Sequence, residues 1–531
     1  MPDDIPTLPQ VLKAEAGYHT AMAGKWHLGS AQRKLTPTGK GFDEFTGMYM
    51  WDLDSYTKQM YGAPWPPPLM IDWVREHRNG TFYHYAEPMH ATDAITEAAI
   101  EHIRTHAAHH DEGLFLYVAF TAAHSPLQPQ SRHTHVCRHI VNSWRRDFCG
   151  MVVGADEAVA TIINAARKAL GDELLVVLTS DNGGSTWFGG MNAPLRGSKA
   201  TPLEGGTRVP AILLDYTPEQ KYIGYRGSDW EKEGQRIYNG LFHVSDWMPT
   251  LLSLAGVSND RWPAHMDGLD FSAIFHDVPY TPLTSPSLYL NVTYGYTFSA
   301  RSEVLYELYL QEEFLFREAL SAYRIGSYKL IDGPVRDPHY YFESSAGQVN
   351  SSDPSPFAKG LTELGIRLGD AVFGLAPFDQ LRTFLTFGNL HSVYTARQRT
   401  RQDTLRLFDL ATDPLETTNL ASLPQYTHIV AQLRSRIEKI KANRPTPIQK
   451  AYLQLPLDEV WSKMHVPGNC SMNPAIQPRD CRFIHPWIPD VSHARVYLDM
   501  LSLFFLFLLM TFLVYVSCAK RMPTPGLTRA Y

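Results

Sequence analysis

The fold prediction starts from residues 174–205, LLVVLTSDNGGSTWFGGMNAPLRGSKATPLEG. The apolar run 174–179 is short and rich in Leu and Val, which predicts a buried strand. Asp181 and Asn182 come just after this strand, and two glycines then break the regular backbone. Ligands bind at the carboxyl ends of strands in α/β sheets, and neighbouring carboxylate and amide oxygens suit Ca²⁺ or Mg²⁺. The alternative is an Asx turn that only ends the strand.

Helical and strand patterns alternate along the first part of the chain. Helices are predicted at 7–16, 91–106 and 148–170, and strands at 18–22 and 114–120. This alternation predicts an α/β fold with a mostly parallel, doubly wound sheet flanked by helices and with polar groups along one edge. The proline-rich stretch 51–90 is interpreted as an irregular surface excursion.

The sequence is divided into an α/β domain at 1–290 and a smaller C-terminal α+β domain at 291–445. Alternating patterns at 323–330 and 405–410 predict a small antiparallel sheet, and 428–440 predicts an amphipathic helix. Residues 333–400 lack a clean period and are interpreted as an insertion. A proline-rich stalk is expected at 446–499.

Residues 500–519 carry no charge and are long enough to span about 30 Å as a helix, so they predict a single transmembrane helix. Lys520 and Arg521 follow it, which places the tail 520–531 in the cytosol and the rest in a lumen or outside the cell. A lysosomal or other endomembrane location and the cell surface both remain open. Four glycosylation sequons are compatible with this route, at Asn79, Asn291, Asn350 and Asn469.

Composition excludes several classes of protein. The apolar fraction of 44% and charged fraction of 19% are those of a folded chain. A net charge of −6 without a basic block argues against nucleic acid as a partner. The five cysteines form no CxxC pair, which excludes a zinc ribbon, and a Cys470–Cys481 disulfide is expected. The group His106, His109 and His110 is interpreted as a solvated helix end. The sequence does not specify an oligomeric state.

Basic side chains accompany the predicted cation pair. Lys25 and His27 lie in a glycine-bracketed loop, AGKWHLG, and His124 follows the strand 114–120. Lys199 belongs to the loop after Asp181 and Asn182. Taken singly, each could be a solvated lysine or a structural histidine. Together on one sheet edge they suit an anionic oxyester, because cations neutralise its oxygens and a histidine can protonate the leaving oxygen.

Several motifs in order resemble the sulfatase family, closest to the arylsulfatase B (N-acetylgalactosamine-4-sulfatase) and arylsulfatase I/J branch. The similarity covers about residues 5–445. The motifs are GYHTAMAGKWHLG at 17–29, HSPL at 124–127, SDNGG at 180–184, PLRGSK at 194–199, EGGTRVP at 204–210, HVSDWMPT at 243–250 and LFDLATDP at 407–414.

The resemblance implies an alkaline-phosphatase-like α/β core that uses Ca²⁺ to hydrolyse sulfate esters, among them glycosaminoglycan N-acetylgalactosamine 4-sulfate. The nucleophile would be a formylglycine made from a cysteine. By the same resemblance, Asp181 and Asn182 would bind Ca²⁺, and Lys25 and His27 would hold the formylglycine and the sulfate. Lys199 would bind sulfate oxygens, and His124 would hydrogen-bond the bridging oxygen.

The sequence departs from the family pattern at one point. The family carries paired aspartates and Cys-x-Pro-x-Arg ahead of the GKWH motif, and neither is found here. The start of the chain also has no signal peptide. We therefore expect that an N-terminal segment is missing, that the chain as printed does not hydrolyse sulfate esters, and that the sheet keeps an exposed edge. A pseudoenzyme that binds sulfated glycans and a phosphate or phosphonate hydrolase are the alternatives.

Overall fold

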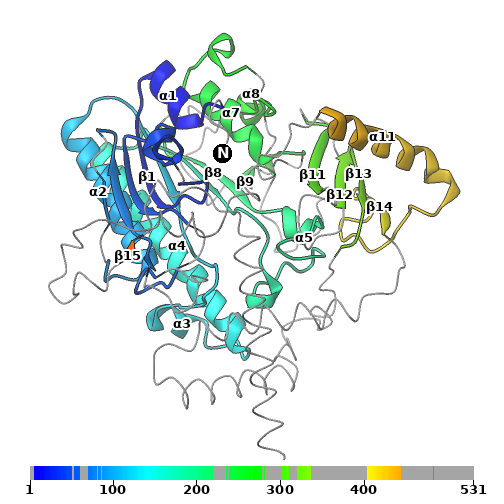
Figure 1. Cartoon of the computed structure of the whole chain (residues 1–531), viewed down its shortest axis with the longest axis horizontal. Coiled ribbons are helices and arrows are strands. Elements are labelled where there is room, and N and C mark those ends of the chain that lie inside the picture. Colours follow the sequence, from blue (N-terminus) through cyan, green and yellow to red (C-terminus); the bar gives the residue numbers. More distant parts are fainter. Residues whose placement is uncertain are drawn as a thin grey trace, which may run out of the picture.

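A computed structural model gives the arrangement of the chain (Figure 1). It describes residues 5–218, without 31, 51–52, 60–69, 80–81 and 85–86; residues 235–281, without 237, 239, 265 and 278–279; and residues 301–309, 320–335, 404–443 and 482–483. The transmembrane helix predicted at 500–519, the tail 520–531 and the Cys470–Cys481 pair lie outside the described residues.

The first helix, α1 (Leu8–Ala16), has clear start and stop signals in the sequence. The side chain of Gln10 accepts a hydrogen bond from the backbone N–H of Thr7 at 2.9 Å, which satisfies a donor at the helix start. Gly17 ends the helix in the left-handed conformation, with φ of 69°. The predicted helix at 7–16 is therefore confirmed.

The central sheet has five strands in the order β5-β4-β2-β1-β6. The strand β1 (His19–Lys25) pairs in parallel with β2 (Glu44–Met48) and β6 (Leu114–Ala119). The strands β4 (Val74–His77) and β5 (Phe82–His84) extend it in antiparallel pairing. The prediction of a mostly parallel sheet is right for its centre. The interpretation of 51–90 as a surface excursion is wrong for residues 70–79 and 82–84, which supply β4 and β5, whereas the proline-rich part at 60–69 lies outside the described residues.

Two glycines let the central strands approach closely. A Cβ on Gly24 would lie 2.0 Å from the carbonyl oxygen of Ala119, and one on Gly47 would lie 2.0 Å from that of Gly24. No side chain fits in these spaces, so glycine is required where β1 contacts both neighbours just before Lys25. The end of β1 is thereby held against both β2 and β6.

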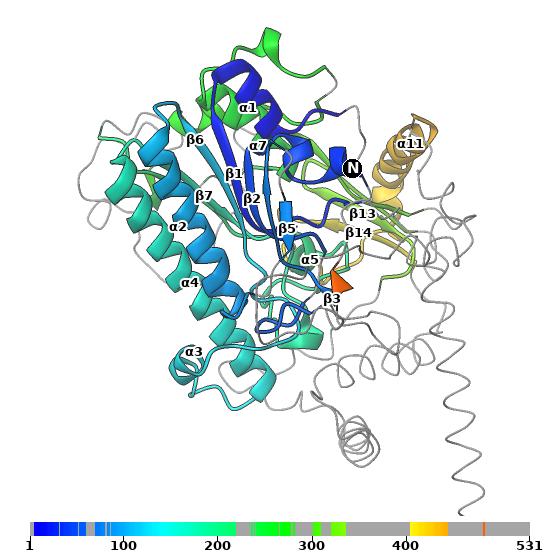
Figure 2. The ribbon, with the colours of Figure 1, turned by 60° about the vertical axis from the view of Figure 1, so that its left-hand side comes forward.

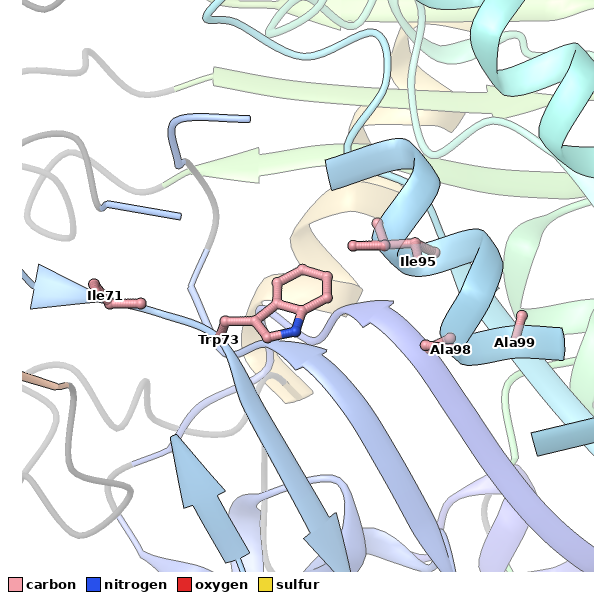
Figure 3. Packing of buried hydrophobic residues seen from close by; sticks show 7 residues of the cluster. Ile71, Trp73, Ile95, Ala98 and Ala99 are labelled. Atoms are coloured by element: carbon pink, nitrogen blue, oxygen red, sulfur yellow. The ribbon is translucent and has the colours of Figure 1, made fainter. Parts of the chain in front are cut away.

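Two long helices, α2 (Ala91–His109) and α4 (Ser143–Leu170), pack against each other on one face of the sheet (Figure 2). Trp73, fully buried, packs with Ile71 and with Ile95, Ala98 and Ala99 of α2 (Figure 3). The small side chains on α2 leave room for the indole. Among the described helices, α4 alone is long and apolar enough to cross a membrane, and its packing against α2 is that of a helix in a globular domain.

The strand predicted at 174–179 is present as β7 (Leu175–Thr179), but the prediction that it is buried is wrong, and it pairs with β8 (Ala211–Asp215) in antiparallel orientation. Among the described residues, β6 is an edge strand of the central sheet, and Tyr117 on it is 52% exposed. Leu178 of β7 and Ile212 of β8 are also exposed. The expectation of an exposed sheet edge is confirmed.

A second sheet lies apart from the first and has four antiparallel strands, β11 (Glu303–Tyr309), β12 (Leu320–Ile325), β13 (Tyr328–Asp332) and β14 (Leu405–Asp409). The helix α11 (Thr427–Asn443) covers one face of it (Figure 1). The small antiparallel sheet predicted from the sequence is present, although the pattern at 323–330 is a hairpin that turns at Gly326 rather than one strand.

The remaining elements are short. A disulfide joins Cys137 and Cys149, with Cα atoms 6.1 Å apart. The short helices are α3 (Ser131–Val136), α5 (Glu204–Thr207), α7 (Trp247–Leu254) and α8 (Ser272–Asp277), and the short strands are β3 (Met70–Ile71), β9 (Gln235–Arg236), β10 (Tyr280–Thr281) and β15 (Arg482–Phe483). The strand β15 pairs with β3 and lies within the predicted stalk, the rest of which is outside the described residues.

A buried ion network fastens α5 to the second sheet. The ammonium of Lys329, on β13, lies 2.9 Å from carboxylate oxygens of both Glu204 and Glu416, and the three side chains are almost fully buried. Glu416 also accepts a hydrogen bond from the backbone N–H of Glu204 at 2.6 Å. Burial opposes the charge on Lys329, but the two carboxylates outweigh it and raise the pKa of the lysine.

We expect Lys329→Met to lower the free energy of unfolding by about 3–5 kcal/mol, because two buried carboxylates lose their counter-ion. Arg434→Met is the matched control, since Arg434 pairs with Asp332 of the same strand at the surface and should contribute less than about 1 kcal/mol. Urea unfolding followed by circular dichroism measures both. Equal losses in the two variants would contradict the prediction.

Candidate functional site

Lys25 is the last residue of β1, and the chain then turns through Trp26 and His27. The buried Trp26 fixes this turn, because its indole N–H donates to the carbonyl oxygens of Gly29 and Leu35 at 2.8 and 3.0 Å. His27 has φ of 52° and donates its backbone N–H to the carbonyl of Tyr49 at 2.9 Å, which leaves its side chain exposed. Lys25 is half-buried beside it.

His124 lies in the turn after β6, and β6 is parallel to β1. Their carboxyl ends therefore meet at the same edge of the sheet. The His124 ring is half-buried, and its Nδ1 lies 2.7 Å from the carbonyl oxygen of Ser125. That contact makes Nδ1 the protonated nitrogen of the neutral ring, so Nε2 carries the lone pair.

Asp181 and Asn182 follow the end of β7, as predicted, and Asp181 is exposed. The next residue, Gly183, donates its N–H to the carbonyl of Gly206 at 2.9 Å. A Cβ on Gly183 would lie 1.9 Å from the carbonyl oxygen of Gly205, so this contact requires glycine. The loop of Asp181 is thereby held against α5.

Asn192 joins the loop of Asp181 to the loop of Lys199. Its side chain accepts from the N–H of Gly184 at 2.7 Å and donates to the carbonyls of Gly184 and Gly197 at 2.8 and 3.1 Å. Lys199 itself donates its backbone N–H to the carbonyl of Gly184. Sequence analysis missed Asn192, because a single asparagine in a glycine-rich stretch carries no periodic or spacing signal.

Electrostatics shows which side chains share this edge. The pKa of His124 falls to about 4, first because the ring is partly buried and second because Lys199 lies nearby. Lys25 lowers it further, and Asp181 opposes both lysines. Asp181 also acts on Tyr117 of β6, whose pKa burial raises. Lys25, Asp181 and Lys199 therefore lie within electrostatic reach of His124, and His27 and Asn182 are their neighbours along the chain.

Asp181 and Asn182 offer oxygen atoms that suit a hard cation. Among the described residues, no donor is hydrogen bonded to the Asp181 carboxylate. Asn182 donates its amide N–H to the carbonyl of Gly183 at 3.0 Å, which leaves its side-chain oxygen as an acceptor. Two hard oxygens therefore face the same loop and fit Ca²⁺, which takes six to eight oxygen ligands. The remaining ligands of such an ion would come from other groups or from water.

Residues 1–257 match the model of the family described as Sulfatase. Mouse (Mus musculus) arylsulfatase J is 35% identical over 271 residues, which cover 51% of this chain and 42% of that protein. Human N-acetylgalactosamine-6-sulfatase is 28% identical over 284 residues, covering 51% of this chain and 48% of that protein. The chain thus spans less than half the length of either relative.

A similar fold occurs in the solved structure of Ps i-CgsB in complex with k-i-k-neocarrahexaose. The TM-score is 0.51 at 19% identity, with 82% of this chain and 74% of that chain covered. This likeness establishes the fold alone. It agrees with the predicted α/β core.

We expect Lys199→Met to raise the pKa of His124 above about 4, because the variant removes the strongest electrostatic cause of its lowering. An unfolded histidine has its ordinary value of 6.5, so the wild type loses stability as the pH falls from 6.5 to about 4. The variant should lose less over this window. An NMR titration of the histidine ring and melting curves at several pH values measure the two effects.

Lys168→Met is the control for this experiment, because Lys168 is exposed on α4 and has no effect on His124. A His124 pKa that stays the same in Lys199→Met would show that Lys199 lies too far from the ring to share a site with it.

Proposed function

Because residues 1–257 form a domain of the sulfatase family, we propose that the protein is a sulfuric ester hydrolase that acts on a sulfated sugar. The observation that carries the proposal is the convergence of two lysines on a half-buried, neutral histidine at the carboxyl edge of a parallel sheet. Two fixed ammonium groups suit a sulfate ester, whose negative charge is spread over its oxygens.

Lys25 and Lys199 bind the sulfate oxygens in this proposal, and His124 contacts the oxygen that bridges sulfur and sugar. Burial and, after it, the two lysines keep His124 neutral in the absence of a bound sulfate. A bound sulfate brings a negative charge that offsets them, so the histidine pKa rises on binding. The ring then becomes able to hold a proton beside the leaving oxygen, which is what general acid catalysis requires. His27, exposed at the end of the same loop, also contacts the sulfate.

Asp181 and Asn182 are the residues that would hold Ca²⁺ in this proposal. When bound, the ion would add positive charge close to the sulfate oxygens. The exposed carboxylate of Asp181 and the side-chain oxygen of Asn182 support the proposal, since hard oxygens are the ligands that Ca²⁺ prefers. Their shared loop is held against α5 by Gly183, so both ligands keep their direction.

The nucleophile expected by resemblance to the family is a formylglycine made from the cysteine of Cys-x-Pro-x-Arg, and the printed sequence does not contain this motif. We propose that the chain as printed binds sulfate esters and does not hydrolyse them. A pseudoenzyme that binds sulfated glycans would have the same properties, and a phosphate or phosphonate hydrolase would differ in its ligand.

The substrate class is proposed from two sources. The sequence resembles the branch that acts on N-acetylgalactosamine 4-sulfate, and a protein of similar fold has been solved with an oligosaccharide, k-i-k-neocarrahexaose. A location in a lumen or outside the cell is proposed as well. It is supported by the Cys137–Cys149 disulfide, because disulfides persist in oxidising compartments. Membrane attachment through 500–519 stays a prediction from sequence.

We expect a protein of this sequence to bind N-acetylgalactosamine 4-sulfate more tightly than N-acetylgalactosamine. We also expect it to release no sulfate from the sulfated sugar. Lys199→Ala should weaken binding of the sulfated sugar by at least about tenfold, since it removes a charged contact. Lys168→Ala should leave binding unchanged. Isothermal titration calorimetry measures affinity, and ion chromatography measures free sulfate.

Equal affinity for the sulfated and unsulfated sugars would contradict the proposed ligand. Tighter binding of the 4-phosphate than of the 4-sulfate would favour the phosphate hydrolase. Release of sulfate by the printed chain would overturn its proposed inactivity.

A further inference from the structure

Three histidines meet at the amino-terminal end of β1, the end of the strand that lies farthest from Lys25. Each offers a ring nitrogen, and the three nitrogens lie within 4.8 Å of one another. His19 opens β1, and His106 and His110 come from the last turn and the C-cap of α2. We propose that His19, His106 and His110 bind a Zn²⁺ ion. The interpretation of His106 and His110 as a solvated helix end is therefore corrected: His106 is only 3% exposed.

The spacing of the nitrogens is close to what a tetrahedral zinc site needs. With Zn–N bonds of about 2.0–2.1 Å, two ligating nitrogens lie about 3.3 Å apart. The Nδ1 atoms of His19 and His106 are 3.1 Å apart. The rings of His19 and His110 stack with their centres 4.1 Å apart, and the three ring nitrogens already lie within 4.8 Å of one another. An ion could therefore be bound after a small tilt of the rings.

Glu112 holds the two histidines of α2 in suitable tautomers. Its carboxylate lies 3.0 Å from Nδ1 of His110, so the neutral ring donates from Nδ1 and keeps the lone pair on Nε2. The His106 ring is hydrogen bonded to the backbone of Glu112. Metal-binding histidines commonly donate their second ring nitrogen to a carboxylate or a backbone carbonyl in this way. One residue thus supplies the outer contacts of two ligands.

The charges around the cluster favour a cation and not three protonated rings. The side chains of His19 and His106 are buried, and as ligands both rings would be neutral so that their lone pairs are available. The positive charge of an ion would be offset by Glu112, whereas Asp43 is paired with Lys13 and Arg78, and Glu44 with His102. Neutral imidazoles next to carboxylates are a donor set suited to zinc, and a water can occupy the fourth position.

The test uses the full chain, freed of metal by a chelator and titrated with Co²⁺ as a spectroscopic probe for Zn²⁺. We expect one Co²⁺ per chain with the visible absorption of a tetrahedral ion, and its stoichiometric displacement by Zn²⁺. His110→Ala should abolish this absorption and weaken Zn²⁺ binding at least tenfold. Zn²⁺ should also raise the melting temperature of the wild type but not of His110→Ala.

His109→Ala is the matched control, because His109 lies one residue away on α2 and its Nδ1 contacts the carbonyl oxygen of Thr105 at 3.0 Å. It should bind Co²⁺ like the wild type. Asp181→Asn should also keep the absorption of tetrahedral Co²⁺. That result would show that the absorption comes from the histidine site and not from the proposed Ca²⁺ loop. Glu112→Gln should keep the absorption but weaken binding by about 10- to 100-fold.

Two results would overturn the proposal. One is a wild type whose Co²⁺ spectrum shows only octahedral coordination. The other is a His110→Ala variant that keeps the wild-type spectrum and affinity. Circular dichroism establishes that each variant is folded, and His110 is only half-buried at a helix end, so its loss should not unfold the domain.

Discussion

The buried Lys329–Glu204–Glu416 network is the interaction on which the geometry of the candidate site depends. Glu204 begins α5, and α5 contacts the loop of Asp181 through Gly205 and Gly206. Leu203, just before it, packs with Phe408 in the core of the second sheet. A lysine on that sheet thus fixes the backbone against which the proposed Ca²⁺ ligands rest. The second sheet is a support for the site, although it supplies none of the site residues.

The same arrangement explains why the proposed sulfate-binding groups come from distant parts of the sequence. The carboxyl ends of β1 and β6 bring Lys25 and His124 to one edge, because parallel strands end on the same side. The loop of Lys199 reaches that edge through Asn192 and the backbone of Gly184, which are fixed in turn by α5. The sheet edge and the loop of Lys199 therefore meet near His124, whose pKa is lowered by burial first and by Lys199 and Lys25 after it.

Sequence reasoning succeeded where the signal is local. An apolar run followed by Asp-Asn-Gly-Gly predicted the end of β7 at Thr179. The end of β1 was predicted too early, because Gly24 and Lys25, assigned to a loop from the sequence, are the last two residues of that strand. Sequence reasoning failed where a strand depends on distant partners. Val74–His77 reads VREH, a polar segment, yet it joins the sheet because Arg75 pairs with Glu101 and Glu76 accepts from Thr38 and Tyr49. The buried position of His106 was missed for the same reason, since its partner His19 is 87 residues away.

The strand β1 joins the two sites proposed in this protein, and its length limits how they can influence each other. His19 and Lys25 are six residues apart along an extended strand, or about 20 Å. Coulomb energy falls with distance, so a charge bound at one end has only a weak direct effect at the other. Any coupling must pass through the packing of β1. A metal ion at His19 would fasten the start of β1 to the end of α2, and the glycine contacts at Gly24 already fix its other end. Zinc would therefore stabilise the frame of the site and leave the pKa of His124 unchanged.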